Sequence, residues 1–184
     1  MRRLPGANYF FQRLLSRFLR ENLADRTIMD EYATNNIFTY APGANPKQRI
    51  LPKPRPDFAL FRTKKLIGFL DAKYRDIWEK GFPARWLYQL SIYALASPNQ
   101  ASILLYGTMS TDARDERIDI RQPIWWSSKG AAFLILRPVP LQRMAELLGP
   151  SQRDRSASER KRFADELVAF DVNKPKRERA AGGI

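Results

Sequence analysis

Residues 56–74 read PDFALFRTKKLIGFLDAKY, and this stretch decides the fold. Because proline disfavours helix in the residue before it, the prolines that lead up to Asp57 deliver that residue in an extended state. Two runs rich in apolar residues, 57–62 and 66–74, flank the polar turn 62–65. Such a pattern is typical of two antiparallel strands joined by a tight turn, so the stretch predicts a β-hairpin.

Charged residues gather at one end of the predicted hairpin. Side chains at positions i and i+2 of a strand share a face, so Asp71 and Lys73 point the same way, with Cα atoms about 7 Å apart. The turn brings Asp57, at the start of the first strand, back beside residues 70–73. Two carboxylates and an ammonium group therefore converge. The simpler interpretation is a surface ion pair between Asp71 and Lys73 at a strand end.

Two neighbouring carboxylates repel each other unless a cation lies between them, so this cluster predicts a Mg²⁺ site. A lysine beside the metal can orient or deprotonate a water molecule, or stabilise charge that develops on a phosphate. The chain has no Cys and no His, which excludes thiol or histidine nucleophile systems and Cys- or His-ligated metals. Any metal must therefore be a hard cation held by oxygen.

The composition of the 184 residues indicates one ordinary domain with a polyanionic partner. Hydrophobic residues make up 44%, enough for a core, and the formal net charge is +13. Basic surfaces gain affinity by releasing counterions from phosphates, so a polyanion is the expected partner and an anionic membrane surface is the competing one. No apolar stretch approaches the roughly 20 residues of a membrane span. We expect a cytoplasmic protein that does not bind membranes.

The first predicted helix runs from Asn8, as its N-cap, to about Leu23. Arg13, Arg17 and Arg20 fall on its outer face. A solvated helix surface is the simpler interpretation of this row, and contact with phosphates is the other.

The rest of the chain completes a mixed α/β pattern. A proline-rich connector (40–56) precedes the hairpin, and then come a helix (84–96), strands at 101–109, 119–126 and 131–138, and a helix at 141–148. Ser156 and Glu159 form a capping box for a last helix, which carries Phe163, Leu167 and Phe170 on one side. Trp125-Trp126 is interpreted as core or as a base-stacking pair. We expect domain boundaries at 1–150 for the sheet domain and 151–184 for the helix and basic tail.

Pro56-Asp57 followed by Asp71-Ala72-Lys73 resembles the motif of the PD-(D/E)xK nuclease superfamily. That resemblance implies a restriction-endonuclease-like core, which is a central mixed β-sheet flanked by helices. It also implies that Asp57 and Asp71 bind Mg²⁺ and that Lys73 serves catalysis. Gln89 and Tyr93 are similar to the Q-x-x-x-Y element of RecB-like members. At i and i+4 they share a helix face, and the alternative for them is a packing contact with the sheet.

The resemblance is closer to the nuclease domain of the McrC family, the cleavage subunits of modified-cytosine restriction systems. It extends over about residues 8–110 and rests on Asn8-Tyr9-Phe10-Phe11-Gln12, Arg55-Pro56-Asp57, Leu70-Asp71-Ala72-Lys73-Tyr74, Tyr88-Gln89 with Tyr93-Ala94, and Ile103-Leu104-Leu105-Tyr106. Two features depart from the family. Gln12 stands where the pattern usually has Glu, and the nuclease helix begins almost at residue 8, without the region that engages the GTPase partner. A fragment, a minimal stand-alone nuclease and a decayed relative all stay open.

The resemblance implies a Mg²⁺-dependent DNA endonuclease that leaves 5′-phosphate and 3′-hydroxyl ends, with Mn²⁺ as a substitute metal. Asp57, Asp71 and the Ala72 carbonyl would hold the metal. Lys73 would position water with help from Gln12, and Gln89 and Tyr93 would steady Lys73 or a phosphate. The expected DNA contacts are Arg13, Arg17, Arg20, Arg55, Lys64, Lys65, Arg75 and Arg85.

Partners and alternatives follow from the same resemblance. A McrB-like GTPase ring or another motor or specificity subunit is one expected partner, and a homodimer would supply the second site that double-strand cutting requires. Two alternative functions stay open. One is a catalytically weak or inactive DNA-binding or complex-forming module, and the other is a RecB-type exonuclease.

Overall fold

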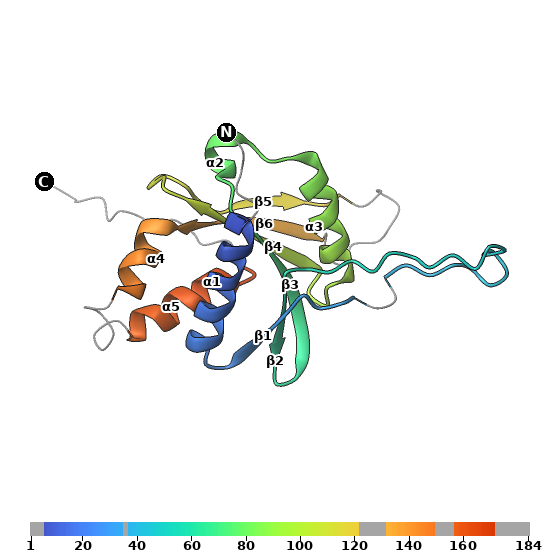
Figure 1. Cartoon of the computed structure of the whole chain (residues 1–184), viewed down its shortest axis with the longest axis horizontal. Coiled ribbons are helices and arrows are strands. Elements are labelled where there is room, and N and C mark those ends of the chain that lie inside the picture. Colours follow the sequence, from blue (N-terminus) through green and yellow to red (C-terminus); the bar gives the residue numbers. More distant parts are fainter. Residues whose placement is uncertain (1–5, 35–36, 122–131, 150–156, 172–184) are drawn as a thin grey trace, which may run out of the picture.

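A computed structural model describes residues 6–34, 37–121, 132–149 and 157–171 (Figure 1). Runs of strands are separated by helices along this part of the chain. In chain order they are α1 (Gly6–Asn22), β1 (Arg26–Asp30), β2 (Phe58–Arg62), β3 (Lys65–Lys73), α2 (Ile77–Lys80), α3 (Ala84–Ala96), β4 (Ala101–Thr108), β5 (Glu116–Asp119), β6 (Phe133–Pro140), α4 (Leu141–Leu148) and α5 (Ala157–Val168).

The described strands form one six-stranded mixed sheet in the order β1-β2-β3-β4-β6-β5. Its centre is parallel, because β4 lies between β3 and β6 and runs in the same direction as both. Its two edges are antiparallel: β1 and β2 on one side, and β5 on the other. Parallel neighbours need a long crossover connection, and the segment with α2 and α3 supplies it between β3 and β4. The predicted mixed α/β core is confirmed.

The predicted hairpin is present as β2 and β3. Phe58 pairs with Leu70 and Arg62 with Lys65, so the turn contains only Thr63 and Lys64. Both turn residues have positive φ angles, 49° and 64°. Two-residue turns with this backbone match the right-handed twist of paired strands. The turn sets the register only as far as Phe61, because an irregularity between Leu60 and Phe61 shifts the pairing by one residue.

Helices cover both faces of the sheet (Figure 1). On one face α1, α4 and α5 pack together, and their buried side chains include Phe11, Leu15, Phe163 and Leu167. On the other face α3 contributes Trp86, Leu90 and Tyr93 to a second cluster. Because successive side chains of a strand point to opposite faces, each central strand contributes to both clusters.

Strand β1 was not predicted from the sequence. It pairs with β2 along five residues and forms an edge of the sheet. Beyond it the backbone N–H of Glu31 donates to the carbonyl of Asp57, and that of Thr34 donates to the carbonyl of Pro54. These hydrogen bonds join the two ends of the long connection between β1 and β2, which projects from the body in Figure 1. The described residues of the predicted connector contain no helix or strand, as expected.

Other boundaries differ from the expectations. Helix α1 begins at Gly6, so Asn8 is not its N-cap but lies in its first turn. The strand expected at 119–126 shares only Asp119 with β5, and its residues 122–126 lie outside the described part of the chain. Helix α5 ends at Val168, so Phe170 lies beyond it, where its ring packs directly over Gly68. Ser156 and the Trp125-Trp126 pair lie outside the described residues, as does most of the tail.

Arg137 of β6 holds the end of α5 in place. Its side chain is buried, forms an ion pair with Asp115 at 2.7 Å, and donates to the carbonyls of Glu166, Leu167, Ala169 and Asp171. Carbonyls at a helix C-terminus lack intrahelical partners, and a cation there also interacts favourably with the helix dipole. The contact therefore fixes α5 on the sheet. Within the described ranges, no helix is long and apolar enough to cross a bilayer.

Candidate active site

Asp57 lies where β2 and β3 separate. The β2–β3 ladder ends at the Phe58–Leu70 pair, while β3 continues to Lys73 beside β4. Beyond the fork, the backbone N–H of Ala72 has no β2 partner and donates instead to Oδ2 of Asp57 at 2.8 Å. This hydrogen bond fixes the Asp57 carboxylate against the carboxyl end of β3.

Asp71 and Lys73 point to the α3 face of the sheet, as their two-residue spacing predicts. Their strand partners are Leu104 and Tyr106, which belong to the core cluster beneath α3. Lys73 Nζ forms an ion pair with Asp71 Oδ2 and lies 3.6 Å from Asp57 Oδ2. The expected convergence of two carboxylates and one ammonium group is therefore present, and Lys73 lies between the acids.

Burial makes this cluster electrostatically unusual. Asp71 is only 2% exposed, and burial together with the charge of Asp57 raises the pKa of Asp71 to about 7, although Lys73 opposes the shift. Burial by itself would lower the pKa of Lys73, but attraction to the two carboxylates outweighs it and the pKa is raised. Asp71 Oδ1 is buried and has no hydrogen-bond partner among the described residues.

These residues fit a divalent cation that prefers oxygen. Asp71 Oδ1 is a buried acceptor without a partner, which is a costly arrangement that a bound cation would relieve. Within the described part of the chain, no group of three or more acidic side chains forms a complete metal cage. Mg²⁺ often binds through one or two carboxylates and keeps several waters, so two carboxylates and a backbone carbonyl suit it.

Gln89 and Tyr93 of α3 lie together beside this cluster. Gln89 Nε2 donates to the Tyr93 hydroxyl oxygen at 2.9 Å, as their spacing of four residues allows. Burial raises the pKa of Tyr93 to about 12, and the charges of Asp71 and Asp57 add to the increase. Tyr93 therefore stays protonated near the carboxylates, and its own proton is free to be donated. Its ring also packs 6.1 Å from that of Phe69, so the predicted packing role is present too.

Gln12 reaches the same end of the sheet from α1. Residues 8, 12 and 16 form one stripe along this helix. Asn8 Oδ1 accepts a hydrogen bond of 2.8 Å from the backbone N–H of Tyr74, and Ser16 Oγ donates to Asp30, the β1 partner of Phe58. Gln12 is half-buried between these two contacts. It belongs to α1, which covers the sheet face opposite α3, and among the described residues it forms no hydrogen bond with Asp57, Asp71 or Lys73.

The predicted DNA-contacting residues divide into two groups. Arg75 and Arg85 lie near the site, 5.7 Å and 5.9 Å from the ring of Trp86, and form no ion pair within the described residues. Arg55 is exposed and only two residues before Asp57.

The other basic residues are engaged elsewhere or distant. Arg17 binds Glu21, and Arg20 binds Asp30. Arg13 lies over the ring of Tyr9. Lys64 and Lys65 lie at the hairpin turn, about 26 Å from Lys73 along a nine-residue strand.

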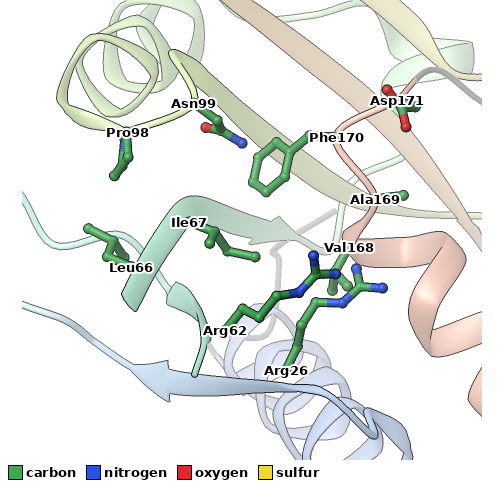
Figure 2. A pocket seen from close by; sticks show the side chains of 10 residues that line it. All are labelled: Arg26, Arg62, Leu66, Ile67, Pro98, Asn99, Val168, Ala169, Phe170 and Asp171. Carbon is green, nitrogen blue, oxygen red and sulfur yellow. The ribbon is translucent and has the colours of Figure 1, made fainter. Parts of the chain in front are cut away.

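A pocket of about 460 Å³ lies at that distant end and takes no part in the site (Figure 2). Arg26 and Arg62 line it from neighbouring positions of β1 and β2, opposite Phe170. Both arginines bind Asp25, and Arg26 also binds Asp165, so each has an acidic partner.

Two features of the site were missed in the sequence. The first is Trp86, whose ring contacts Arg75 and Arg85, an arrangement that only the fold shows. Helix α2 had a readable signal, since Asp76 followed three residues later by Glu79 is a capping pattern. Asp76 Oδ1 accepts from the backbone N–H groups of Trp78 and Glu79, while its Oδ2 accepts from Thr108 Oγ1 at the end of β4.

No protein-family model and no curated protein matches this chain. Its structure is similar to a chain in the refined half-complex from the tetradecameric assembly of Thermococcus gammatolerans McrB AAA+ hexamers with bound McrC. The TM-score is 0.53 at 15% sequence identity, and the match covers 88% of this chain and 33% of the other. The chain thus spans about a third of the length of the chain it matches. The described fold is a mixed six-stranded sheet flanked by helices, consistent with a restriction-endonuclease-like core and shared with a chain of an McrB–McrC assembly.

Proposed function

We propose that this chain is a metal-dependent DNA endonuclease, an McrC-like cleavage subunit or domain of a restriction or defence system. The observation that carries the proposal is the cluster at the β2–β3 fork, where Lys73 lies within ion-pair distance of both Asp57 and Asp71. The buried, unpartnered Asp71 Oδ1 favours a cation there. The fold shared with a chain of an McrB–McrC assembly supports the same proposal.

Asp57 and Asp71 would hold the Mg²⁺ ion, with the Ala72 carbonyl as a further oxygen ligand. When bound, a divalent cation neutralises charge on the phosphate and lowers the pKa of a bound water. The hydrogen bond from the Ala72 N–H keeps Asp57 in place for this role. Mn²⁺ accepts the same ligands and would substitute.

Lys73 would orient the attacking water and stabilise charge on the phosphate. Because the carboxylates raise its pKa, Lys73 is protonated at neutral pH and acts as a donor rather than as a base. The water would release one proton to solvent as its oxygen bonds to phosphorus and the bond to O3′ breaks. O3′ would take up a proton from a solvent water, which gives a 5′-phosphate and a 3′-hydroxyl. The hydroxyl oxygen of Tyr93 accepts a hydrogen bond from Gln89, and its O–H would donate a hydrogen bond to a phosphate oxygen.

Arg75 and Arg85 would bind the DNA backbone beside the cut. Both guanidinium groups stack near one indole ring, and no carboxylate of the described residues pairs with them. Phosphates attract such arginines through charge and through paired N–H donors. DNA binding that depends on them should weaken as salt rises.

Cleavage of supercoiled plasmid in Mg²⁺ or Mn²⁺ tests the proposal. Nicking or linearisation is expected with the parent and should be lost in EDTA, in Asp71→Ala and in Lys73→Ala. Lys161→Ala, on the exposed surface of α5, is the matched control and should cut like the parent. Cutting by Lys73→Ala at the parent rate would show that the assigned role is wrong.

A catalytically weak DNA-binding or complex-forming module is the second candidate. It is favoured by Gln12, whose amide brings no charge to the site edge. Salt-sensitive DNA binding without cutting in any divalent ion would support it, unless a McrB-like GTPase restores cleavage. A RecB-type exonuclease would instead degrade linear DNA and leave circles intact.

A further inference from the structure

Four aromatic side chains around the candidate site are exposed to solvent. Tyr9 is 61% exposed, Phe10 69%, Tyr74 49% and Trp78 38%. We call these four residues the aromatic rim. Single exposed aromatic residues are common on protein surfaces, but several at one site indicate a binding surface.

Contacts of their neighbours bring the rim residues to one end of the sheet. Tyr74 directly follows Lys73, its N–H binds Asn8 of α1, and its ring lies 5.7 Å from that of Phe11. Tyr9 and Phe10 lie in the first turns of α1, between the two residues that contact Tyr74, and their side chains point outward.

Trp78 belongs to the same end through α2. Its backbone N–H binds Asp76, and Asp76 in turn binds Thr108 at the carboxyl end of β4. Thr108 lies two residues beyond Tyr106, which is the strand partner of Lys73. The rim residues therefore belong to α1, α2 and the end of β3, which meet at the carboxyl ends of β3 and β4.

Positive charge is interleaved with these rings. Arg13 lies 6.0 Å from the centre of the Tyr9 ring, and Arg75 directly follows Tyr74. Alternating cations and exposed rings match a nucleic-acid strand, which presents phosphates and flat base faces in turn. A duplex hides those base faces inside its stack, so only unpaired bases can use the rings.

We propose that the aromatic rim stacks on unpaired bases and that the preferred substrate of this site is single-stranded DNA, including an unpaired stretch within a duplex. The proposal rests on the proposed nuclease function and adds its substrate class. Lys73 directly precedes Tyr74 in the chain, so a strand held at the end of the sheet would pass close to the carboxylate cluster.

Fluorescence anisotropy in EDTA measures the affinity of the protein for DNA probes without cleavage. The probes are a 15-nucleotide oligo(dT), an oligonucleotide of equal length made of abasic sites, and a duplex. The first two carry the same phosphates and differ only in bases. The parent should bind oligo(dT) at least about fivefold more tightly than the abasic strand, since one stacked base is worth that much.

Variants of Tyr9 test whether the rim causes the preference for oligo(dT) over the abasic strand. Tyr9→Ala should lose most of this preference and Tyr9→Phe should keep it. The dependence of binding on salt should stay unchanged in both, because no charge is removed. Tyr88→Ala is the matched control: Tyr88 is 68% exposed on a helix, on the side of α3 opposite its buried residues. It should bind like the parent.

Equal affinity of the parent for oligo(dT) and abasic strands would overturn the proposal, and so would tighter binding to the duplex than to oligo(dT). Loss of binding that is equal for all probes in Tyr9→Ala would also overturn it, because stacking must act through bases. Failure of the nuclease proposal is distinguishable, since the binding assay contains no metal while plasmid cutting measures activity separately.

Discussion

Replacing Asp71 by asparagine should stabilise the metal-free protein at pH 8. Asp71 is buried beside a second carboxylate, and its pKa is raised from 3.8 to about 7. Each pKa unit corresponds to about 1.4 kcal/mol, so keeping this carboxylate ionised in the fold costs on the order of 4 kcal/mol. Asparagine keeps the size and removes the charge.

The net gain should be smaller than that cost. Asparagine also loses the attraction of Lys73, which still keeps Asp57 as a partner. We therefore expect Asp71→Asn to raise the free energy of unfolding by about 1–3 kcal/mol. For a chain of this length, each kcal/mol raises Tm by about 2–4 °C.

The gain should depend on pH with a defined sign. The pKa of Asp71 is higher in the folded state than in the unfolded state, so the destabilisation is absent below about pH 4. It grows between the two pKa values and is complete above about pH 7. The difference between variant and parent should therefore be small at pH 4 and largest at pH 8.

Urea denaturation in EDTA at several pH values measures this difference. Asp119→Asn is the control, because that carboxylate is exposed at the end of β5 and should change little. A parent as stable as Asp71→Asn at pH 8, or a difference that does not vary with pH, would refute the electrostatic reasoning. Adding Mg²⁺ should stabilise the parent and leave Asp71→Asn unchanged, because a ligand that binds only the folded state stabilises it.

Three further substitutions test how the fold supports the site. Arg137→Met should cost about 3–5 kcal/mol in urea denaturation, since it breaks a buried ion pair and removes the donor to the end of α5; a loss below 1 kcal/mol would contradict the assigned role. Gly68→Ala should cost about 1–3 kcal/mol because a Cβ would overlap the Phe170 ring, and adding Phe170→Ala should recover much of this loss. Asn8→Ala should cost about 0.5–1.5 kcal/mol through the lost hydrogen bond from Tyr74, and DNA cleavage should fall more than it does in an Asn45→Ala control.

Local sequence patterns predicted much of the fold. The hairpin and helices α1 and α3 follow from spacing alone, because apolar periodicity and turn residues act over a few positions. Helix α3 runs from Ala84 to Ala96, as predicted. That Asp57 lies near residues 70–73 was also predictable, because a two-residue turn brings the start of the first strand back beside them. The exact register was not, because a bulge between Leu60 and Phe61 shifts the pairing by one residue.

Segments that depend on distant partners could not be predicted in this way. Strand β1 is short and gains its hydrogen bonds only by pairing with β2, about 30 residues later in the chain. Arg137 is a charged residue within an apolar run, and nothing near it in sequence shows that it is buried. Its partners, Asp115 and the carbonyls after α5, come from two other segments.

The sequence by itself determined the hairpin, the pair of carboxylates and the lysine, because these depend on local backbone geometry. Only the tertiary structure decided the environment of that cluster. Burial under α3 raises the pKa of Asp71, and Asn8 ties α1 to the strand end beside the site. The aromatic rim likewise combines residues from α1, β3 and α2. Burial and electrostatic coupling depend on which distant segments pack together, and chain folding rather than local spacing sets that packing.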